Sequence, residues 1–177
     1  MTLDEIYQRA KAAFDAKIAG IAELVNGKTV LTTLKSRERA LNKIHHEHFG
    51  DATKIRDILR ATIVVDSVDK VNDAYQRTFE NFLVTSSRNG YLAKVHSSDG
   101  YFDAKIDVDF MGVNAEIQIH TQAMLDAKEK AHGLFRKRQA IQRAVPKGYR
   151  PSSEQARKIN ELNKQMRELF REAVNTG

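Results

Sequence analysis

The sequence predicts an α+β fold in which a mixed, mainly antiparallel β-sheet is flanked by helices. Residues 59–66 and 103–110 alternate between apolar and polar side chains, which is the pattern of strands with one buried face. An apolar stripe at helical spacing runs through residues 2–25, and a heptad-like seam runs through residues 153–174. Strands in the middle of the chain with long helices at both ends favour this class.

The composition indicates an ordinary soluble globular protein. Its 177 residues fit a single domain, 1–177, with a core at about 30–137 on which helices 2–25 and 153–174 pack. Hydrophobic residues make up 41% and charged residues 29%, and no apolar run is long enough to span a membrane. The lack of cysteine excludes disulfides and thiolate metal sites, which suits the cytoplasm. A net charge of +6 favours anionic partners such as nucleotides or RNA, although solvated lysines and arginines give the same balance.

The other elements follow from local patterns. Residues 34–48 are expected to form an unusually basic helix, and residues 68–82 have helical apolar spacing. Residues 91–97 are expected to form a weaker strand after an Arg-Asn-Gly turn. A basic helix at 121–143 and the helix at 153–174 close the chain. The seam of this last helix is more typical of a helix docked on its own domain than of a coiled-coil dimer.

A β-hairpin is predicted where strand 103–110 meets residues 115–121. A loop centred on Gly112 and Val113 would pair the apolar residues, which are Phe110 with Ala115, Val108 with Ile117 and Ile106 with Ile119. The same register places Asp109 opposite Glu116 and Asp107 opposite Gln118. The polar face of this hairpin is therefore expected to be acidic.

Two carboxylates stand out as candidates for phosphoryl chemistry. Asp57 lies just before strand 59–66, and Glu116 lies on the polar face of the hairpin. Mg²⁺ is usually held by one or two carboxylates together with substrate phosphates, so this pair suits a metal-assisted transfer. Helix 34–48 and Arg60 could supply the positive charge. The alternative is structural, with Asp57 capping a turn and Glu116 pairing with Lys105 across the hairpin.

Other candidate groups are less specific. The segment 89–91 (Asn-Gly-Tyr) could present an aromatic ring to a nucleobase, or it could be a turn followed by a half-buried tyrosine. Lys128, His132 and Arg136 recur every four residues on one helical face, which is either solvated or part of a site. The sequence has no GxxxxGK phosphate loop, no GxGxxG, no GxSxG and no HExxH motif.

In their order and spacing, these segments resemble the RelA/SpoT-type nucleotide pyrophosphokinase (synthetase) domain over about residues 30–137. The segments that match are Lys35-Ser36 with Lys43, Asp57-Ile58, Asn89-Gly90-Tyr91, Glu116-Ile117-Gln118-Ile119-His120-Thr121, and Glu129 with His132. The resemblance implies a nucleotidyltransferase-like fold. It also implies transfer of pyrophosphate from ATP to a ribose hydroxyl of an acceptor nucleotide, GTP or GDP, which would give a ppGpp-type alarmone.

The resemblance also implies roles for individual residues. Asp57 and Glu116 would hold Mg²⁺, and Glu116 would help to activate the attacking hydroxyl. The residues expected to bind ATP are Lys35, Ser36, Lys43 and Arg60. The residues expected to bind the acceptor are Asn89, Tyr91, Gln118, His120 and His132.

The chain departs from the family pattern at three arginines. Arg60-Ala61-Thr62 stands where Gly-x-Arg is usual, residues 92–96 (LAKVH) replace an Arg-Ser-hydrophobic-His run, and His120 stands where the glutamate segment has arginine. Each lost arginine removes a bidentate phosphate clamp.

Three functions therefore remain open. They are a guanine-nucleotide alarmone synthetase, a toxin-type enzyme acting on adenine nucleotides or tRNA 3′ ends, and a non-catalytic nucleotide- or RNA-binding module. The presence of both carboxylates favours an enzyme. The partners expected are ATP, an acceptor nucleotide or tRNA, an antitoxin or immunity protein, and a second copy of the chain.

Overall fold

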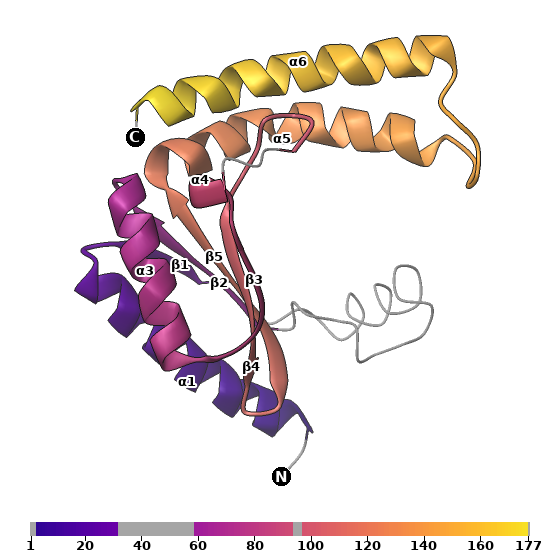
Figure 1. Cartoon of the computed structure of the whole chain (residues 1–177). Helices are drawn as coiled ribbons and strands as arrows, with labels where there is room; N and C mark the ends of the chain where they lie inside the picture. Colours follow the sequence, from indigo (N-terminus) through magenta and orange to yellow (C-terminus); the bar gives the residue numbers. More distant parts are fainter. Residues whose placement is uncertain (1–2, 32–58, 94–96, 177) are drawn as a thin grey trace. The chain divides into compact units, whose positions relative to one another are not determined.

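The computed structural model of the chain describes residues 3–31, 59–93 and 97–176 (Figure 1). The chain divides into two compact units. The sheet unit comprises residues 1–89 and 103–120, and the helical unit comprises residues 90–102 and 121–177. The expected helix 34–48 lies outside the described residues, and the single domain 1–177 stays a prediction.

The described residues of the sheet unit form a five-stranded sheet in the order β1-β2-β5-β4-β3. The strands are β1 (Lys28–Leu31), β2 (Leu59–Val65), β3 (Leu83–Asn89), β4 (Ala104–Phe110) and β5 (Val113–Thr121). β1 pairs antiparallel with β2, and β4 pairs antiparallel with both β3 and β5. The predicted class, a mixed and mainly antiparallel sheet with flanking helices, is confirmed.

Two helices pack against this sheet and against each other, and both were predicted (Figure 1). α1 (Leu3–Leu24) buries one stripe that includes Ala10, Phe14 and Ile18. The ring of Phe14 meets the rings of Phe82 and Phe110 edge-on, at centroid distances of 5.8 and 5.7 Å. α3 (Val68–Asn81) begins after Ser67, whose hydroxyl oxygen accepts a hydrogen bond from the Lys70 N–H. The apolar face of the sheet is therefore the one that α1 and α3 cover.

Three elements differ from the sequence prediction. β1 and β3 are edge strands that the prediction omitted. Most residues of both strands are exposed, so neither shows the apolar alternation that identifies a strand. The strand predicted at 91–97 is wrong, because α4 (Gly90–Ala93) is a short helix and the pairing of β3 with β4 ends at Asn89.

The β4–β5 hairpin turns more tightly than predicted. Met111 and Gly112 have φ angles of 56° and 76°, in the left-handed region that two-residue hairpin loops require. Phe110 therefore faces Val113, where the predicted four-residue loop paired it with Ala115. The predicted register is wrong by two residues.

The shift changes the partners across the hairpin but not the faces. Because side chains alternate along a strand, a slip of two residues leaves every side chain on its predicted face. The corrected register places Asp107 opposite Glu116 and Lys105 opposite Gln118. Asp109, predicted to face Glu116, is opposite Asn114 instead.

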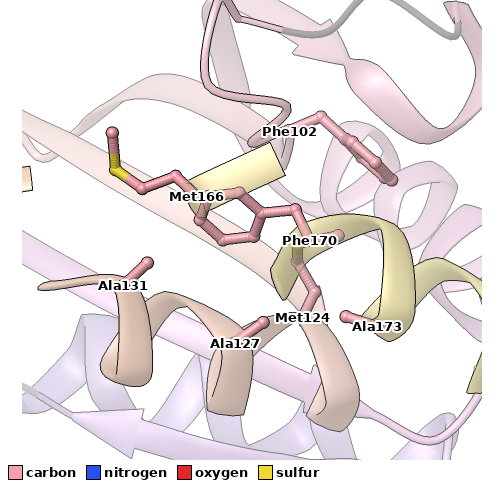
Figure 2. Close-up of a cluster of buried hydrophobic side chains, with 7 residues drawn as sticks. All are labelled: Phe102, Met124, Ala127, Ala131, Met166, Phe170 and Ala173. Carbon is pink, nitrogen blue, oxygen red and sulfur yellow. The ribbon is translucent and has the colours of Figure 1, made fainter. Parts of the chain in front are cut away.

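The described part of the helical unit contains the short helix α4, the loop 97–102 and two long helices. α5 (Gln122–Arg143) and α6 (Ser153–Thr176) confirm the two predicted closing helices. They share a core with the loop, made by the buried side chains of Phe102, Met124, Ala127, Ala131, Met166, Phe170 and Ala173 (Figure 2). Met166 of α6 is thus buried within the helical unit itself. None of the described helices has the length and hydropathy needed to cross a membrane.

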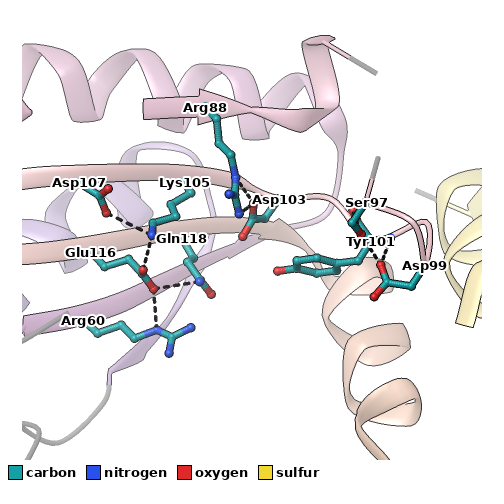
Figure 3. Close-up of polar contacts among 10 residues, drawn as sticks. All are labelled: Arg60, Arg88, Ser97, Asp99, Tyr101, Asp103, Lys105, Asp107, Glu116 and Gln118. Carbon is teal, nitrogen blue, oxygen red and sulfur yellow. Dashed lines mark hydrogen bonds and ion pairs between the residues drawn. The ribbon is translucent and has the colours of Figure 1, made fainter. Parts of the chain in front are cut away.

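A buried polar clamp fixes the loop 97–102 to both long helices. One Asp99 oxygen accepts a hydrogen bond from Arg138 Nη1 at 2.6 Å, and the same nitrogen donates to Asn163 Oδ1 at 2.8 Å. The other Asp99 oxygen accepts from the Ser97 hydroxyl and from the Tyr101 N–H (Figure 3). Burial acts to raise the pKa of Asp99, but these hydrogen bonds outweigh it and hold the pKa below its usual value.

The hairpin turn gives a first prediction. Met111→Asn should stabilise the protein by about 0.5 kcal/mol, because asparagine tolerates the left-handed backbone better than methionine does. Met111 is 64% exposed, so little packing is lost. Denaturant unfolding measures the effect, with Met111→Ala as the matched control. Equal stabilities of the two variants would contradict the assignment of the turn.

The clamp gives a second prediction. Asp99→Asn should lower the free energy of unfolding by about 2 kcal/mol at pH 7, because Arg138 loses its charged partner. The pKa of Asp99 is lowered on folding, so this contribution is present above the usual aspartate pKa of about 4 and is lost as the pH falls below it. Urea unfolding of both proteins between pH 7 and pH 3 should show the stability difference shrinking in acid. A difference that stays constant over this range would refute the clamp.

Candidate functional site

Polar side chains from three neighbouring strands meet on the face of the sheet opposite to α1 and α3. Glu116 of β5 lies at their centre (Figure 3). Its Oε1 is 3.1 Å from Arg60 Nε of β2 and accepts a hydrogen bond from Gln118 Nε2 at 3.0 Å. Its Oε2 is 2.6 Å from Lys105 Nζ of β4. We call Arg60, Lys105, Asp107, Glu116 and Gln118 the carboxylate centre.

The corrected hairpin register explains how the centre forms. Asp107 lies directly opposite Glu116, and its Oδ1 is 3.4 Å from Lys105 Nζ. The Lys105 ammonium therefore lies between two carboxylates. A hydroxyl hydrogen bond from Ser86 on β3, at 2.8 Å, holds the other Asp107 oxygen.

Burial makes this pairing necessary. Glu116 and Asp107 are only 8% and 6% exposed. A buried carboxylate loses hydration, and it stays ionised only if cations and hydrogen-bond donors compensate for that loss. Two carboxylates face two cations, so the formal charges of the centre cancel. Burial lowers the pKa of Lys105, but Glu116 and Asp107 outweigh it and raise the pKa above its usual value.

The donor chemistry of the centre fits Mg²⁺. Carboxylate oxygens are hard ligands, and Mg²⁺ is commonly bound by one or two of them, with phosphates and water filling the other positions. Among the described residues, no group of three or more acidic, histidine or cysteine side chains could hold a metal ion. Asp57, the other predicted ligand, lies outside the described residues.

The structure brings together part of the predicted site. Gln118 and Arg60 both contact Glu116 directly, and the separate roles predicted for these three residues stay predictions. Lys35, Ser36 and Lys43, predicted to bind ATP, lie outside the described residues. The alternative interpretation, an ion pair between Glu116 and Lys105, is also present in the structure. This ion pair alone does not show whether Glu116 has a structural or a catalytic role.

The predicted acceptor-binding residues of the sheet unit are buried or partly buried. His120, on the same strand face as Glu116 and Gln118, is 0% exposed. Asn89 Nδ2 donates to Asn72 Oδ1 at 3.1 Å, which ties the end of β3 to α3. Their predicted contacts with an acceptor stay predictions.

Tyr91 and His132 belong to the helical unit. The hydroxyl oxygen of Tyr91 accepts a hydrogen bond from the Thr121 N–H at 3.1 Å, and its ring packs edge-on against Phe102 at 4.8 Å. His132 is exposed on α5. Tyr91 therefore contributes to the packing of the helical unit, and base stacking by its ring stays a prediction.

Lys105 was predicted only as a structural partner of Glu116, and Asp107 was predicted to pair with Gln118. The position of Asp107 directly opposite Glu116 depends on the register, which the alternation of side chains does not determine. Tyr101, after Gly100, is a second Gly-Tyr pair that was passed over. Its ring has Lys128 Nζ 5.3 Å from its centroid and the ring of Phe170 at 5.5 Å. Gly-Tyr also occurs at 148–149, so the repetition in the sequence does not single out Tyr101.

The sheet carries a buried, charge-balanced carboxylate centre whose chemistry suits phosphoryl transfer, and comparison with known proteins identifies the family. No family model matches the chain. The chain is 36% identical over 130 residues to the (p)ppApp synthetase toxin Tas1 of Pseudomonas aeruginosa strain UCBPP-PA14. The match covers 68% of this chain and 26% of Tas1, so the chain spans about a quarter of that relative's length.

Solved structures share the fold along nearly the whole chain. The complex of the type VI effector Tas1 with its immunity protein matches with a TM-score of 0.71 and 24% identity, over 98% of this chain and 96% of that one. A GTP pyrophosphokinase family protein from Streptococcus pneumoniae matches with a TM-score of 0.63 and 21% identity, over 99% and 93%. Small alarmone synthetase 1 from Bacillus subtilis, bound to its product pppGpp, matches with a TM-score of 0.61 and 20% identity, over 96% and 91%.

The chain belongs to the RelA/SpoT-type synthetase domains, as a divergent member. The predicted resemblance is thereby confirmed. The prediction of a pyrophosphokinase-type transferase domain is confirmed at the level of the family.

Proposed function

We propose that this domain is an ATP-dependent pyrophosphokinase of the toxin type, which transfers pyrophosphate to a ribose hydroxyl of an adenine nucleotide. The observation that carries the proposal is the buried Glu116 held by Arg60 and Lys105. The choice of adenine rests on the 36% identity to a relative named as a (p)ppApp synthetase toxin. Guanine nucleotides and tRNA 3′ ends are the alternative acceptors.

In the proposed reaction, the acceptor hydroxyl oxygen forms a bond to the β-phosphorus of ATP. The bond from that phosphorus to the oxygen bridging the α- and β-phosphates breaks, and AMP leaves with that oxygen. Glu116 orients the hydroxyl and accepts its proton. In the transition state the transferred phosphoryl group carries its negative charge on its oxygens. The other residues of the site therefore act by positioning the two substrates and by stabilising this charge.

Arg60 and Lys105 have a second role in this proposal. In the ligand-free protein both cations neutralise Glu116. When ATP is bound, they turn toward its phosphates, because phosphate oxygens compete with the carboxylate for the same donors. Arg60 can thereby replace one of the arginine clamps that the chain lacks.

Mg²⁺ would be held by Glu116 and Asp57, and it would neutralise the phosphate charge that develops during transfer. The corrected register places Asp107 beside Glu116, where it can support the same ion. We also propose that the domain has a protein partner that blocks it, because the Tas1 structure is a complex with an immunity protein.

The central test is transfer of labelled pyrophosphate. The protein is incubated with γ-labelled ATP, Mg²⁺ and, in separate reactions, AMP, ADP, ATP, GDP, GTP or bulk tRNA. Adenine nucleotides should gain the label, and Glu116→Gln should reduce the rate by about 10³-fold or more, because the proton acceptor is lost. Asp73→Asn, which changes an exposed carboxylate of α3, is the matched control and should be fully active.

The outcomes separate the alternatives. Label in GDP or GTP alone would identify a guanine-nucleotide synthetase, and label in tRNA alone would identify an RNA-modifying toxin. ATP binding without transfer to any acceptor would overturn the enzyme and favour a non-catalytic nucleotide-binding module.

Lys105 gives a prediction that does not depend on turnover. Its ammonium lies between the two carboxylates, so it competes with any divalent cation that binds there. Lys105→Met should tighten the binding of Mn²⁺, measured by electron paramagnetic resonance without nucleotide, by about tenfold. Lys70→Met, which removes a surface ion pair with Asp66, should leave Mn²⁺ binding unchanged. Unchanged Mn²⁺ affinity in a folded Lys105→Met protein would disprove the competition.

A further inference from the structure

The positive charge of the chain is concentrated in its last third. Residues 121–177 contain 13 lysines and arginines against 6 aspartates and glutamates, whereas the whole chain has 29 against 23. The rest of the chain is therefore slightly acidic. This excess of positive charge favours the binding of anionic ligands by the helical unit. The helical unit contains neither Glu116 nor its partners.

The helical unit contains a groove of about 560 Å³ between the loop 97–102 and α6. Phe102, Phe170 and Val174 form its apolar part. Lys164, Arg167 and Arg171 line it from one face of α6, with Glu168 as the one acidic lining residue. The groove thus combines an apolar floor with a net positive rim.

The loop side of the groove is held in place by contacts within the helical unit. The Asp99 clamp fixes the loop, and Arg167 Nη1 donates to the Ser98 carbonyl at 2.6 Å. Gly100 has a φ of 83°, and a Cβ at this position would lie 3.2 Å from the Arg167 Cα. Any other residue would therefore push the loop away from α6. A preformed wall reduces the entropy lost when a ligand binds.

We propose that this groove binds a phosphorylated nucleoside, either free or as the terminal nucleotide of an RNA strand. Its volume lies within the range of about 300–1,000 Å³ that small-ligand sites have. The three cations follow at intervals of three and four residues, so they span about 10 Å of the helix, the scale of a short chain of phosphates. The apolar floor and the guanidinium planes suit the base.

Photolabelling locates the ligand without requiring catalysis. The full chain is irradiated with 8-azido-ATP and digested, and labelled peptides are identified by mass spectrometry. We expect label within residues 97–102 or 164–174. Displacement by unlabelled ATP would identify a free nucleotide as the ligand, and displacement by tRNA with an intact 3′ end would identify an RNA terminus. Label confined to other segments would overturn the proposal.

Two charge-matched variants complete the test. Lys164→Glu/Arg171→Glu should reduce labelling of the groove by about tenfold or more, because two charge-assisted contacts are lost. Arg150→Glu/Arg157→Glu changes the net charge equally at exposed positions outside the groove lining, and should label normally. Equal loss in both variants would show a general charge effect and refute the site. Groove labelling should persist in Glu116→Gln, so failure of the pyrophosphokinase assay leaves this test intact.

Discussion

The pairing of Glu116 with Arg60 and Lys105 is the interaction on which the candidate site depends. A carboxylate that is nine-tenths buried in the middle of a sheet would be strongly destabilising without compensating charge. The compensation comes from both neighbouring strands, β2 on one side and β4 on the other. The centre therefore requires three strands in correct register, and it could not be built from a local motif alone. The same ionic contacts that make the buried carboxylate tolerable also gather two cations around it.

The two faces of the sheet differ in the interactions that hold their side chains. The apolar face carries Ile63, Ile106 and Ile117, all fully buried, and is covered by α1 and α3. Its stability comes from apolar area removed from water, which does not depend on charge. The polar face carries the carboxylate centre, whose members are held by electrostatics. Substitutions on the polar face therefore act through charge balance, and substitutions on the apolar face act through lost burial.

Sequence patterns predict the elements of this protein well where burial has a clear period. α1, α3, α5 and α6 and the strands β2, β4 and β5 all have such a pattern, and their bounds agree with the prediction to within two residues, apart from the tighter turn into β5. The edge strands β1 and β3 were missed because exposed strands need no apolar alternation. The face of Glu116 was predictable from alternation, and its role was suggested by resemblance. Its partner across the hairpin was not predictable, because two registers bury the same apolar residues and only the backbone of the turn selects between them.

That turn has a consequence for how such a domain can diverge. Two residues, Met111 and Gly112, set which pairs of side chains meet on the polar face. A residue at Gly112 that cannot adopt this backbone would favour a four-residue loop and a register shifted by two residues, which preserves the inside and outside of both strands. Asp107 would then lie opposite Gln118, and Glu116 would lie opposite Asp109. Residues at a solvent-exposed loop tip thus control the geometry of the polar face while the core sequence stays unchanged, and they are the first positions to compare among relatives.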